Sequence, residues 1–267
     1  MNFTERAGRR VHWAEVGEGP ALVLLPGLGS GMRLFGTLPR RFARTGFRAL
    51  THDPLGVPPS DPLAGAFDFE AAADDVFAVV DAAGCDRVHL VGTSLGGRVA
   101  LVAAARRPER VERLVLLASS AVPTPRSRRV QRFFEIVAES VPEQRFGDVV
   151  APFLFGRSFH AAHPGVVDDI VRATRPSAAT RALMVAQAQA LQHFDARDAA
   201  QRIRAPALCL AGAEDTLTGT DEVRATADLL PAGRYREFAH AGHSLLLEDG
   251  TVFDAVVDFL RAQEPEA

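Results

Sequence analysis

Residues 88–97 have the sequence VHLVGTSLGG, in which an apolar run ends at a serine flanked on both sides by small residues. A continuous apolar run of this length is typical of a strand buried on both faces, and residues 98–107 have a helical pattern. Bulky residues at positions 92 and 96 would clash with a tight strand-to-helix turn, so the glycines there allow Ser94 to expose its hydroxyl. The stretch therefore predicts Ser94 as a nucleophile. The alternative is a glycine-rich turn that only packs the helix on the strand or binds phosphate.

Short β-rich runs alternate with helical segments along most of the chain. This alternation predicts an α/β fold with a mostly parallel, twisted, eight-stranded sheet flanked by helices. A turn signal at Ala7 and Gly8 indicates an opening hairpin. A last helix is expected over residues 252–261. The candidate strands are Phe3–Arg6, Val11–Val16, Ala21–Leu25, Arg48–His52, Arg87–Val91, Arg113–Leu117, Ala207–Ala211 and Tyr235–Phe238.

One segment interrupts this alternation. Residues 122–202 contain helical patterns broken by prolines and no strand-like run. We expect a helical cap inserted into a core formed by residues 1–121 and 203–267. The segment carries aromatic residues that we predict to contact substrate, although packing of the cap onto the core would also explain them: Phe133, Phe134, Phe153 and Phe155.

A serine hydroxyl needs a base to become a nucleophile at neutral pH, and His243 is the histidine that the sequence favours. It lies in the loop AHAGHS, residues 239–244, between the last strand and the last helix. In a parallel sheet this loop opens at the same carboxyl edge as the turn at Ser94. Gly242 gives the backbone freedom to direct the imidazole, whereas His240 is expected to be a surface residue.

The imidazole needs a carboxylate to fix its tautomer and stabilise its charge. Asp215 follows the strand at residues 207–211 and should lie at that same edge. Glu214 is its nearest competitor, and Asp221 is a weaker one. The predicted catalytic residues are then Ser94, Asp215 and His243, in that chain order.

Acyl transfer also requires two hydrogen-bond donors directed at the developing oxyanion. The backbone NH of Leu95, at the start of a helix, is one candidate. The backbone NH of Leu28, in the loop PGLGSG at residues 26–31, is the other. A phosphate loop is the alternative for this segment, but it has neither the G-x-x-x-x-G-K-S/T nor the G-x-G-x-x-G pattern.

These motifs resemble those of the α/β-hydrolase superfamily, and the resemblance covers almost the whole chain outside the cap. Residues 53–60, DPLGVPPS, are similar to the D-x-x-G-x-G-x-S turn of that family, with Pro58 in place of the second glycine. Pro26 stands where many members have a histidine. Within the superfamily the chain is similar to 3-oxoadipate enol-lactonases and small esterases. Epoxide hydrolases and dehalogenases place an aspartate where this chain has Ser94.

The resemblance implies a serine hydrolase that cleaves a small or medium carboxylic ester or lactone through an acyl-enzyme, without a cofactor. Two alternatives stay open. One is carbon–carbon bond hydrolysis of a vinylogous diketone by the same residues. The other is a ligand-binding protein that keeps the fold without turnover.

Composition restricts the partners. The chain has 267 residues, 30 Lys and Arg against 33 Asp and Glu, and a net charge of −3. No basic segment calls for nucleic acid, and no apolar stretch approaches the roughly 20 residues of a membrane span. We expect no metal, because His160 and His163 lack completing ligands. A small-molecule substrate is the expected partner, and homo-oligomer formation is left open. Cys85 and Cys209 are predicted to be reduced and the protein to be cytoplasmic.

Overall fold

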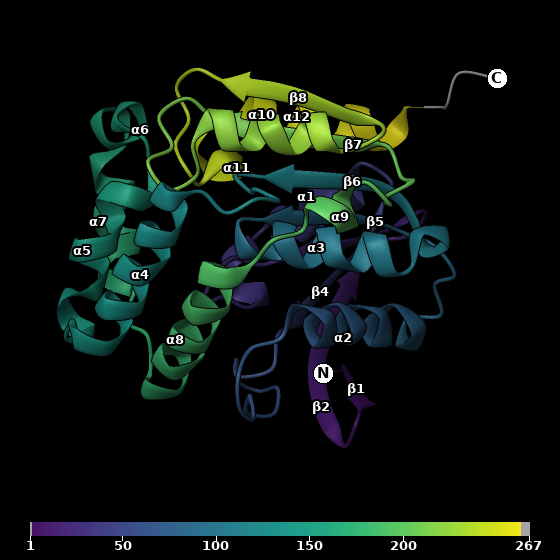
Figure 1. Ribbon diagram of the computed structural model, residues 1–267, viewed down its shortest axis with the longest axis horizontal. Helices are drawn as coiled ribbons and strands as arrows, with labels where there is room; N and C mark the ends of the chain where they lie inside the picture. The colour runs from purple at the N-terminus through teal and green to yellow at the C-terminus, as the bar shows by residue number, and fades with distance from the viewer. Residues whose placement is uncertain (1, 263–267) are drawn as a thin grey trace.

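An eight-stranded sheet runs through the computed structural model, which describes residues 2–262 (Figure 1). The strand order is β1-β2-β4-β3-β5-β6-β7-β8. The pairs β1–β2 and β2–β4 are antiparallel, and all the other pairs are parallel. The strands are β1 (Asn2–Arg6), β2 (Arg9–Val16), β3 (Ala21–Leu25), β4 (Arg48–Asp53), β5 (Val88–Thr93), β6 (Val111–Leu117), β7 (Ala207–Gly212) and β8 (Gly233–Phe238).

The predicted fold class is confirmed, including the mostly parallel sheet and the opening hairpin. Strand β3 has the expected bounds, and the ends of the other strands differ from them by at most two residues. The strand β6, for example, begins at Val111 rather than at Arg113. Strand ends are harder to predict than strand centres, because burial on both faces makes the centre continuously apolar while polar residues are tolerated at the ends.

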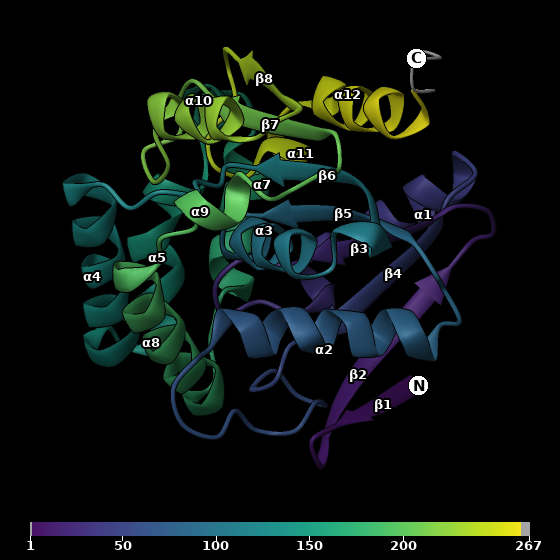
Figure 2. The same ribbon diagram turned by 45° about the vertical axis from the view of Figure 1, so that its right-hand side comes forward.

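Helices cover both faces of the sheet (Figure 2). The helices α1 (Leu38–Arg44) and α12 (Gly250–Arg261) pack on one face, and α2 (Phe69–Ala82), α3 (Leu95–Arg106) and α10 (Thr220–Leu229) pack on the other. Strand β3 is fully buried and contributes side chains to the helix layers on both faces of the sheet. Leu22 and Leu24 join the α1/α12 side, while Val23 and Leu25 join the α2/α3 side, because successive side chains point to opposite faces.

Between β6 and β7 the chain forms the helical insertion, which we define as residues 122–202. Its helices are α4 (Pro125–Ser140), α5 (Glu143–Leu154), α6 (Arg157–Ala162), α7 (Pro164–Ala173), α8 (Ala178–His193) and α9 (Arg197–Ala200). Several of its prolines mark helix starts, as at Pro125 and Pro164, where the missing N–H has no helical partner to lose. In both views the arrowheads of the parallel strands point toward α4–α8, so the insertion lies over the carboxyl edge of the sheet (Figures 1 and 2).

Within residues 2–262, none of the helices combines the length and apolarity that crossing a membrane requires. Cys85 is half-buried and Cys209 is buried, and neither forms a disulfide.

Candidate active site

Ser94 occupies a strained turn between β5 and α3. Its backbone has φ 54° and ψ −117°, a region that residues with a side chain rarely adopt. Two close approaches explain the flanking glycines. A Cβ on Gly92 would lie 2.4 Å from the carbonyl oxygen of Gly96, and a Cβ on Gly96 would lie 2.2 Å from the carbonyl oxygen of Leu25. The glycines therefore allow the turn to close and to pack against the end of β3.

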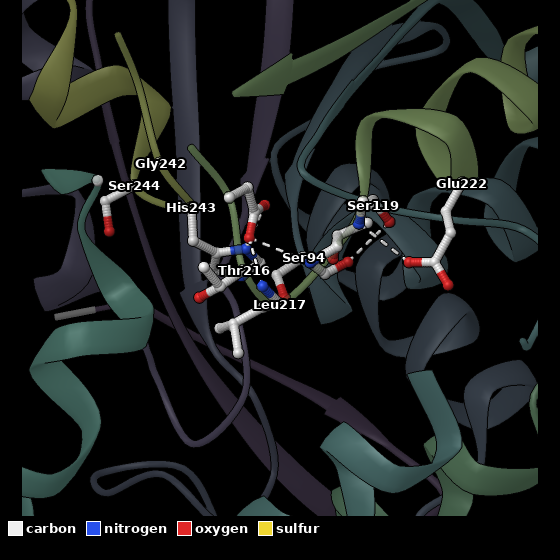
Figure 3. Close-up of polar contacts among 12 residues, drawn as sticks. Ser94, Ser119, Thr216, Leu217, Glu222, Gly242, His243 and Ser244 are labelled. Atoms are coloured by element: carbon white, nitrogen blue, oxygen red, sulfur yellow. Dashed lines mark hydrogen bonds and ion pairs between the residues drawn. The ribbon is translucent and has the colours of Figure 1, made fainter. Parts of the chain in front are cut away.

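Hydrogen bonds to the neighbouring strand fix the backbone of this turn. The Ser94 N–H donates to the carbonyl of Leu117 at 2.8 Å. The hydroxyl of the fully buried Ser119 donates to the Ser94 carbonyl at 2.8 Å (Figure 3). Sequence reasoning did not single out Ser119. The sequence signal that could have identified it is its position two residues after the end of β6, the strand that pairs with β5.

His243 and Asp215 form a direct contact. The distance from His243 Nδ1 to Asp215 Oδ2 is 2.8 Å, and the Asp215 side chain has no exposed surface. The other carboxylate oxygen, Oδ1, accepts the backbone N–H groups of Leu217 at 2.7 Å and of Thr218 at 3.0 Å. A carboxylate only accepts hydrogen bonds, so Nδ1 carries the proton and Nε2 is left free to receive one.

Topology brings Ser94 to the same edge as this pair. The strands β5, β7 and β8 are all part of the parallel section, and Ser94, Asp215 and His243 each follow the carboxyl end of one of them. Figure 3 shows Ser94, His243 and the loop residues Thr216 and Leu217 in one group. Among residues 2–262 the Ser94 hydroxyl makes no hydrogen bond to the imidazole. Such contacts are often long in unliganded enzymes and shorten when substrate binds.

The competing candidates have other partners. Glu214 accepts hydrogen bonds from the backbone and hydroxyl of Ser158, at 2.7 and 2.6 Å, and from Arg157 at 3.1 Å. Burial raises the pKa of the Glu214 carboxyl, but these hydrogen bonds outweigh burial, so the net shift is downward. Asp221 is exposed in the first turn of α10, and His240 is exposed as expected. Of these acids, the structure brings only Asp215 to His243.

Glu248 organises the loop that carries His243, and sequence reasoning did not identify it. Its carboxylate accepts three backbone N–H groups, from Gly156 at 2.8 Å, Gly242 at 2.7 Å and Ser244 at 2.8 Å. Gly242 and Ser244 flank His243, and Gly156 belongs to the helical insertion. One carboxylate thus joins the histidine loop to the insertion, through hydrogen bonds strengthened by its charge.

The predicted oxyanion donors lie on either side of Ser94. Leu95 begins α3, where helical N–H groups lack partners and the helix dipole favours negative charge. In the loop 26–31, a Cβ on Gly27 would lie 3.7 Å from the Cβ of Ser94, so this loop borders the nucleophile. Within the described chain, neither the Leu28 nor the Leu95 amide donates to another residue. Both N–H groups are therefore free of protein partners among the described residues, as the prediction of two oxyanion donors requires.

The four predicted substrate-contacting aromatics divide into two groups. Phe133, Phe134 and Phe153 pack together, with ring centroids 5.0 to 6.4 Å apart, in a cluster that also includes Leu28 and Leu217 from the core. Phe155 belongs to a separate cluster inside the insertion, where it packs on Phe159 at 5.5 Å. The first group borders the candidate oxyanion loop, and Phe155 does not.

A buried arginine stabilises the backbone beside Ser119. Arg98 donates to both the carbonyl and the hydroxyl of Ser120, at 3.1 and 3.0 Å. Burial lowers the pKa of Arg98 to about 10, partly opposed by the Glu222 carboxylate, so the guanidinium stays charged at neutral pH. Figure 3 shows Glu222 on the far side of Ser119 from His243.

Across residues 2–262 no group of three or more His, Cys, Asp or Glu side chains is arranged to hold a metal ion. His160, one of the two histidines with metal-like spacing, has its Nε2 3.3 Å from the carbonyl oxygen of Ala151.

Comparison with known proteins agrees with the fold. The family model described as alpha/beta hydrolase fold matches residues 20–250. The chain belongs to the alpha/beta hydrolase fold family. This hydrolase is 28% identical to a protein of Pseudomonas savastanoi pv. phaseolicola that carries the name carbamate hydrolase RutD, over 95% of this chain and 98% of the other. It is 26% identical to a 2-hydroxy-6-oxo-6-phenylhexa-2,4-dienoate hydrolase of Comamonas testosteroni, over 94% and 91%.

Among solved structures, the enol-lactonase from Burkholderia xenovorans superposes on this hydrolase with a TM-score of 0.86 and 25% identity, covering 98% of this chain and 100% of the other. The chain is therefore a hydrolase by family. The names of these relatives refer to a carbamate, a dienoate and an enol-lactone.

Proposed function

We propose that this chain is a serine hydrolase that cleaves a small or medium carboxylic ester or lactone through an acyl-enzyme intermediate. The observation that carries the proposal is the 2.8 Å contact between His243 Nδ1 and the buried Asp215 carboxylate, at the sheet edge that presents Ser94 on a strained turn. A serine at such a turn, a histidine oriented by a carboxylate and two free amides together make the arrangement used for acyl transfer.

In the proposed mechanism, Ser94 Oγ attacks the substrate carbonyl and its proton passes to His243 Nε2. The carbonyl electron pair moves to oxygen, where the amides of Leu28 and Leu95 donate to the oxyanion. The tetrahedral intermediate collapses, the bond to the leaving oxygen breaks, and His243 gives its proton to that oxygen. A water molecule, deprotonated by His243, then attacks the acyl-enzyme; the bond to Ser94 Oγ breaks, His243 returns the proton to Oγ, and the acid is released. Asp215 stays ionised and stabilises the imidazolium in both steps.

The aromatic cluster supports an apolar substrate group of limited size. Phe133 and Phe153 are partly exposed at the edge of the cluster that contains Leu28 and Leu217. An apolar wall next to the oxyanion loop favours burial of an acyl chain or ring. We propose Phe133, Phe134 and Phe153 as substrate contacts. The two cysteines without a disulfide support our proposal of a reducing, cytoplasmic location.

Labelling with a fluorophosphonate tests the proposal directly, because this probe reacts only with an activated serine. We expect the wild type to be labelled and both Ser94→Ala and His243→Ala to lose labelling. Screening esters, lactones and carbamates would then identify the substrate. Ester hydrolysis that survives unchanged in Ser94→Ala would refute the assignment. Saturable ligand binding without labelling or product would instead support a binding protein of the same fold.

A second candidate reaction is hydrolysis of a carbon–carbon bond in a vinylogous diketone. It is favoured by the similarity to the dienoate hydrolase of Comamonas testosteroni, which covers nearly the whole of both chains. A dienone substrate with product analysis distinguishes the two reactions. Release of a carboxylic acid and a dienol carbon fragment would establish carbon–carbon cleavage, whereas activity on esters alone would support the first proposal.

A further inference from the structure

The loop that carries the Leu28 amide contains a tight turn. The Ser30 N–H donates to the carbonyl of Gly27 at 3.1 Å, which closes a four-residue turn over residues 27–30. Gly29, the third residue, has φ +66°, as a type II turn requires at that position. The peptide between Leu28 and Gly29 is the central peptide of this turn. The Leu28 N–H belongs to the preceding peptide, between Gly27 and Leu28, so the position of the turn as a whole determines where this N–H lies relative to Ser94.

A residue of the helical insertion bonds to that central peptide. Gln187, on α8, is 1% exposed, and its Oε1 accepts the Gly29 N–H at 2.8 Å. One helical turn earlier, Met184 packs on the same glycine, since a Cβ at Gly29 would lie 2.4 Å from Met184 Cγ. The contact spans 158 positions in the sequence and joins the insertion to the loop beside Ser94.

We propose that Gln187 is a positioning residue for the oxyanion hole. Its side-chain oxygen holds the Gly29 N–H and so ties the turn at residues 27–30 to α8, which fixes the position of the Leu28 N–H that we propose as an oxyanion donor. The inference rests on the proposed function, since it assigns Gln187 a role in stabilising the oxyanion of acyl transfer. Gln187 touches the loop and acts through it, so its loss should slow the chemical step more than it weakens ligand binding.

A cavity lies beside Gln187. Gln187 lines this cavity together with Pro26 and Leu95, which border the two proposed oxyanion amides. With Gln187 replaced by a residue that cannot accept a hydrogen bond, the Gly29 N–H loses its partner and the turn is no longer tied to α8. The turn, and the Leu28 N–H with it, would then shift relative to Ser94.

The chain offers a matched control on the same helix. Gln192 is half-buried, and its amide donates to Glu135 at 2.8 Å within the insertion, so it has no contact with the oxyanion loop. Gln187→Met and Gln192→Met therefore make the same chemical change in one helix, and both remove a side-chain hydrogen bond. Only the first change affects the loop.

The experiment measures the inactivation rate constant kinact and the apparent binding constant KI for a fluorophosphonate, together with the melting temperature. We expect Gln187→Met to lower kinact by about 10- to 100-fold, a part of the loss seen when an oxyanion donor is removed, with KI changed less than about threefold. Gln192→Met should leave kinact within about twofold of the wild type, whatever its effect on melting temperature.

A folded Gln187→Met with unchanged kinact would overturn the inference, and so would a rise in KI alone, which would indicate a contact with ligand. If Gln187→Met does not fold, Gln187→Asn provides the test. It keeps a polar amide but is one methylene too short to reach Gly29, so kinact should again fall. Wild-type protein that is not labelled, or is labelled equally in Ser94→Ala, would refute the proposed function itself. A labelled wild type with unaffected Gln187 variants would refute only the positioning role.

Discussion

His52 links the stability of this fold to pH. It lies in β4, is 4% exposed, and its Nδ1 has no hydrogen-bond partner among the described residues. Burial lowers the pKa of His52 to about 4, although the neighbouring Asp53 carboxylate opposes the shift. In the unfolded chain a histidine has a pKa of about 6.5. Because the folded-state pKa is depressed, the neutral imidazole contributes stability that is complete above about pH 6.5 and is lost as the pH falls toward 4.

The difference between the two pKa values sets the size of the effect. Between pH 7 and pH 5 the unfolded chain takes up a proton at this position and the folded chain largely does not, so the free energy of unfolding should fall by about 2 kcal/mol. By pH 4 and below the loss should approach about 3 kcal/mol. This is a large share of the stability of an ordinary domain.

Urea unfolding of the wild type and His52→Leu at pH 7, 6 and 5 measures this contribution. The difference between the two proteins isolates His52, because His12, His89 and the carboxylates are present in both. We expect the variant to lose about 2 kcal/mol less than the wild type over this range. His52→Gln, which differs in size and polarity but also does not titrate, should follow the same pH dependence. Parallel pH profiles for wild type and both variants would show that His52 is protonated as easily in the folded protein as in water, and would refute the reasoning.

Two further predictions concern the proposed catalytic residues and their support. Asp215→Asn should lower kcat by about 10³- to 10⁴-fold, because it stabilises the wrong tautomer of His243. Glu214→Gln should change kcat by less than about tenfold. Steady-state kinetics on one ester would measure both variants, and equal effects would contradict the assignment of Asp215 as the acid. Glu248→Gln replaces a carboxylate that accepts three N–H groups by an amide with one acceptor oxygen. The free energy of unfolding, measured in urea, should therefore fall by about 2 to 4 kcal/mol. An unchanged value would show that these contacts are not stabilising.

The parts of this fold that could be predicted from sequence are those governed by local pattern. Continuous apolar runs indicated the buried strands. Gly92 and Gly96 indicated the tight turn at Ser94, because the residues that must be small for this turn to close lie within a few positions of Ser94. The contact between Asp215 and His243 followed from topology alone, since parallel strands present their carboxyl ends at one edge.

The parts that could not be predicted depend on contacts between distant segments. Gln187 has an ordinary helical context, and nothing near it in the sequence indicates that its partner is Gly29. Glu248 lies five residues after His243, but its bond to Gly156 forms only when the insertion folds back over the sheet edge. The aromatic residues of the insertion were similarly ambiguous. Their apolar side chains predict burial. How the helices pack decides which of them lie near the oxyanion loop, and this packing puts Phe155 in a separate cluster.

These contacts between distant segments connect the helical insertion to the loops of the candidate site. It contacts the core at both of the loops that the proposed reaction depends on, through Gly156 and Glu248 at the histidine loop and through Gln187 at the oxyanion loop. A movement of the insertion would therefore change the position of the base and of an oxyanion donor together. Substrates that pack against Phe133 on α4 and Phe153 on α5, as we propose, would contact the same insertion, so their fit should alter the rate of the chemical step as well as affinity. Variation of the insertion is then expected to change kcat among substrates.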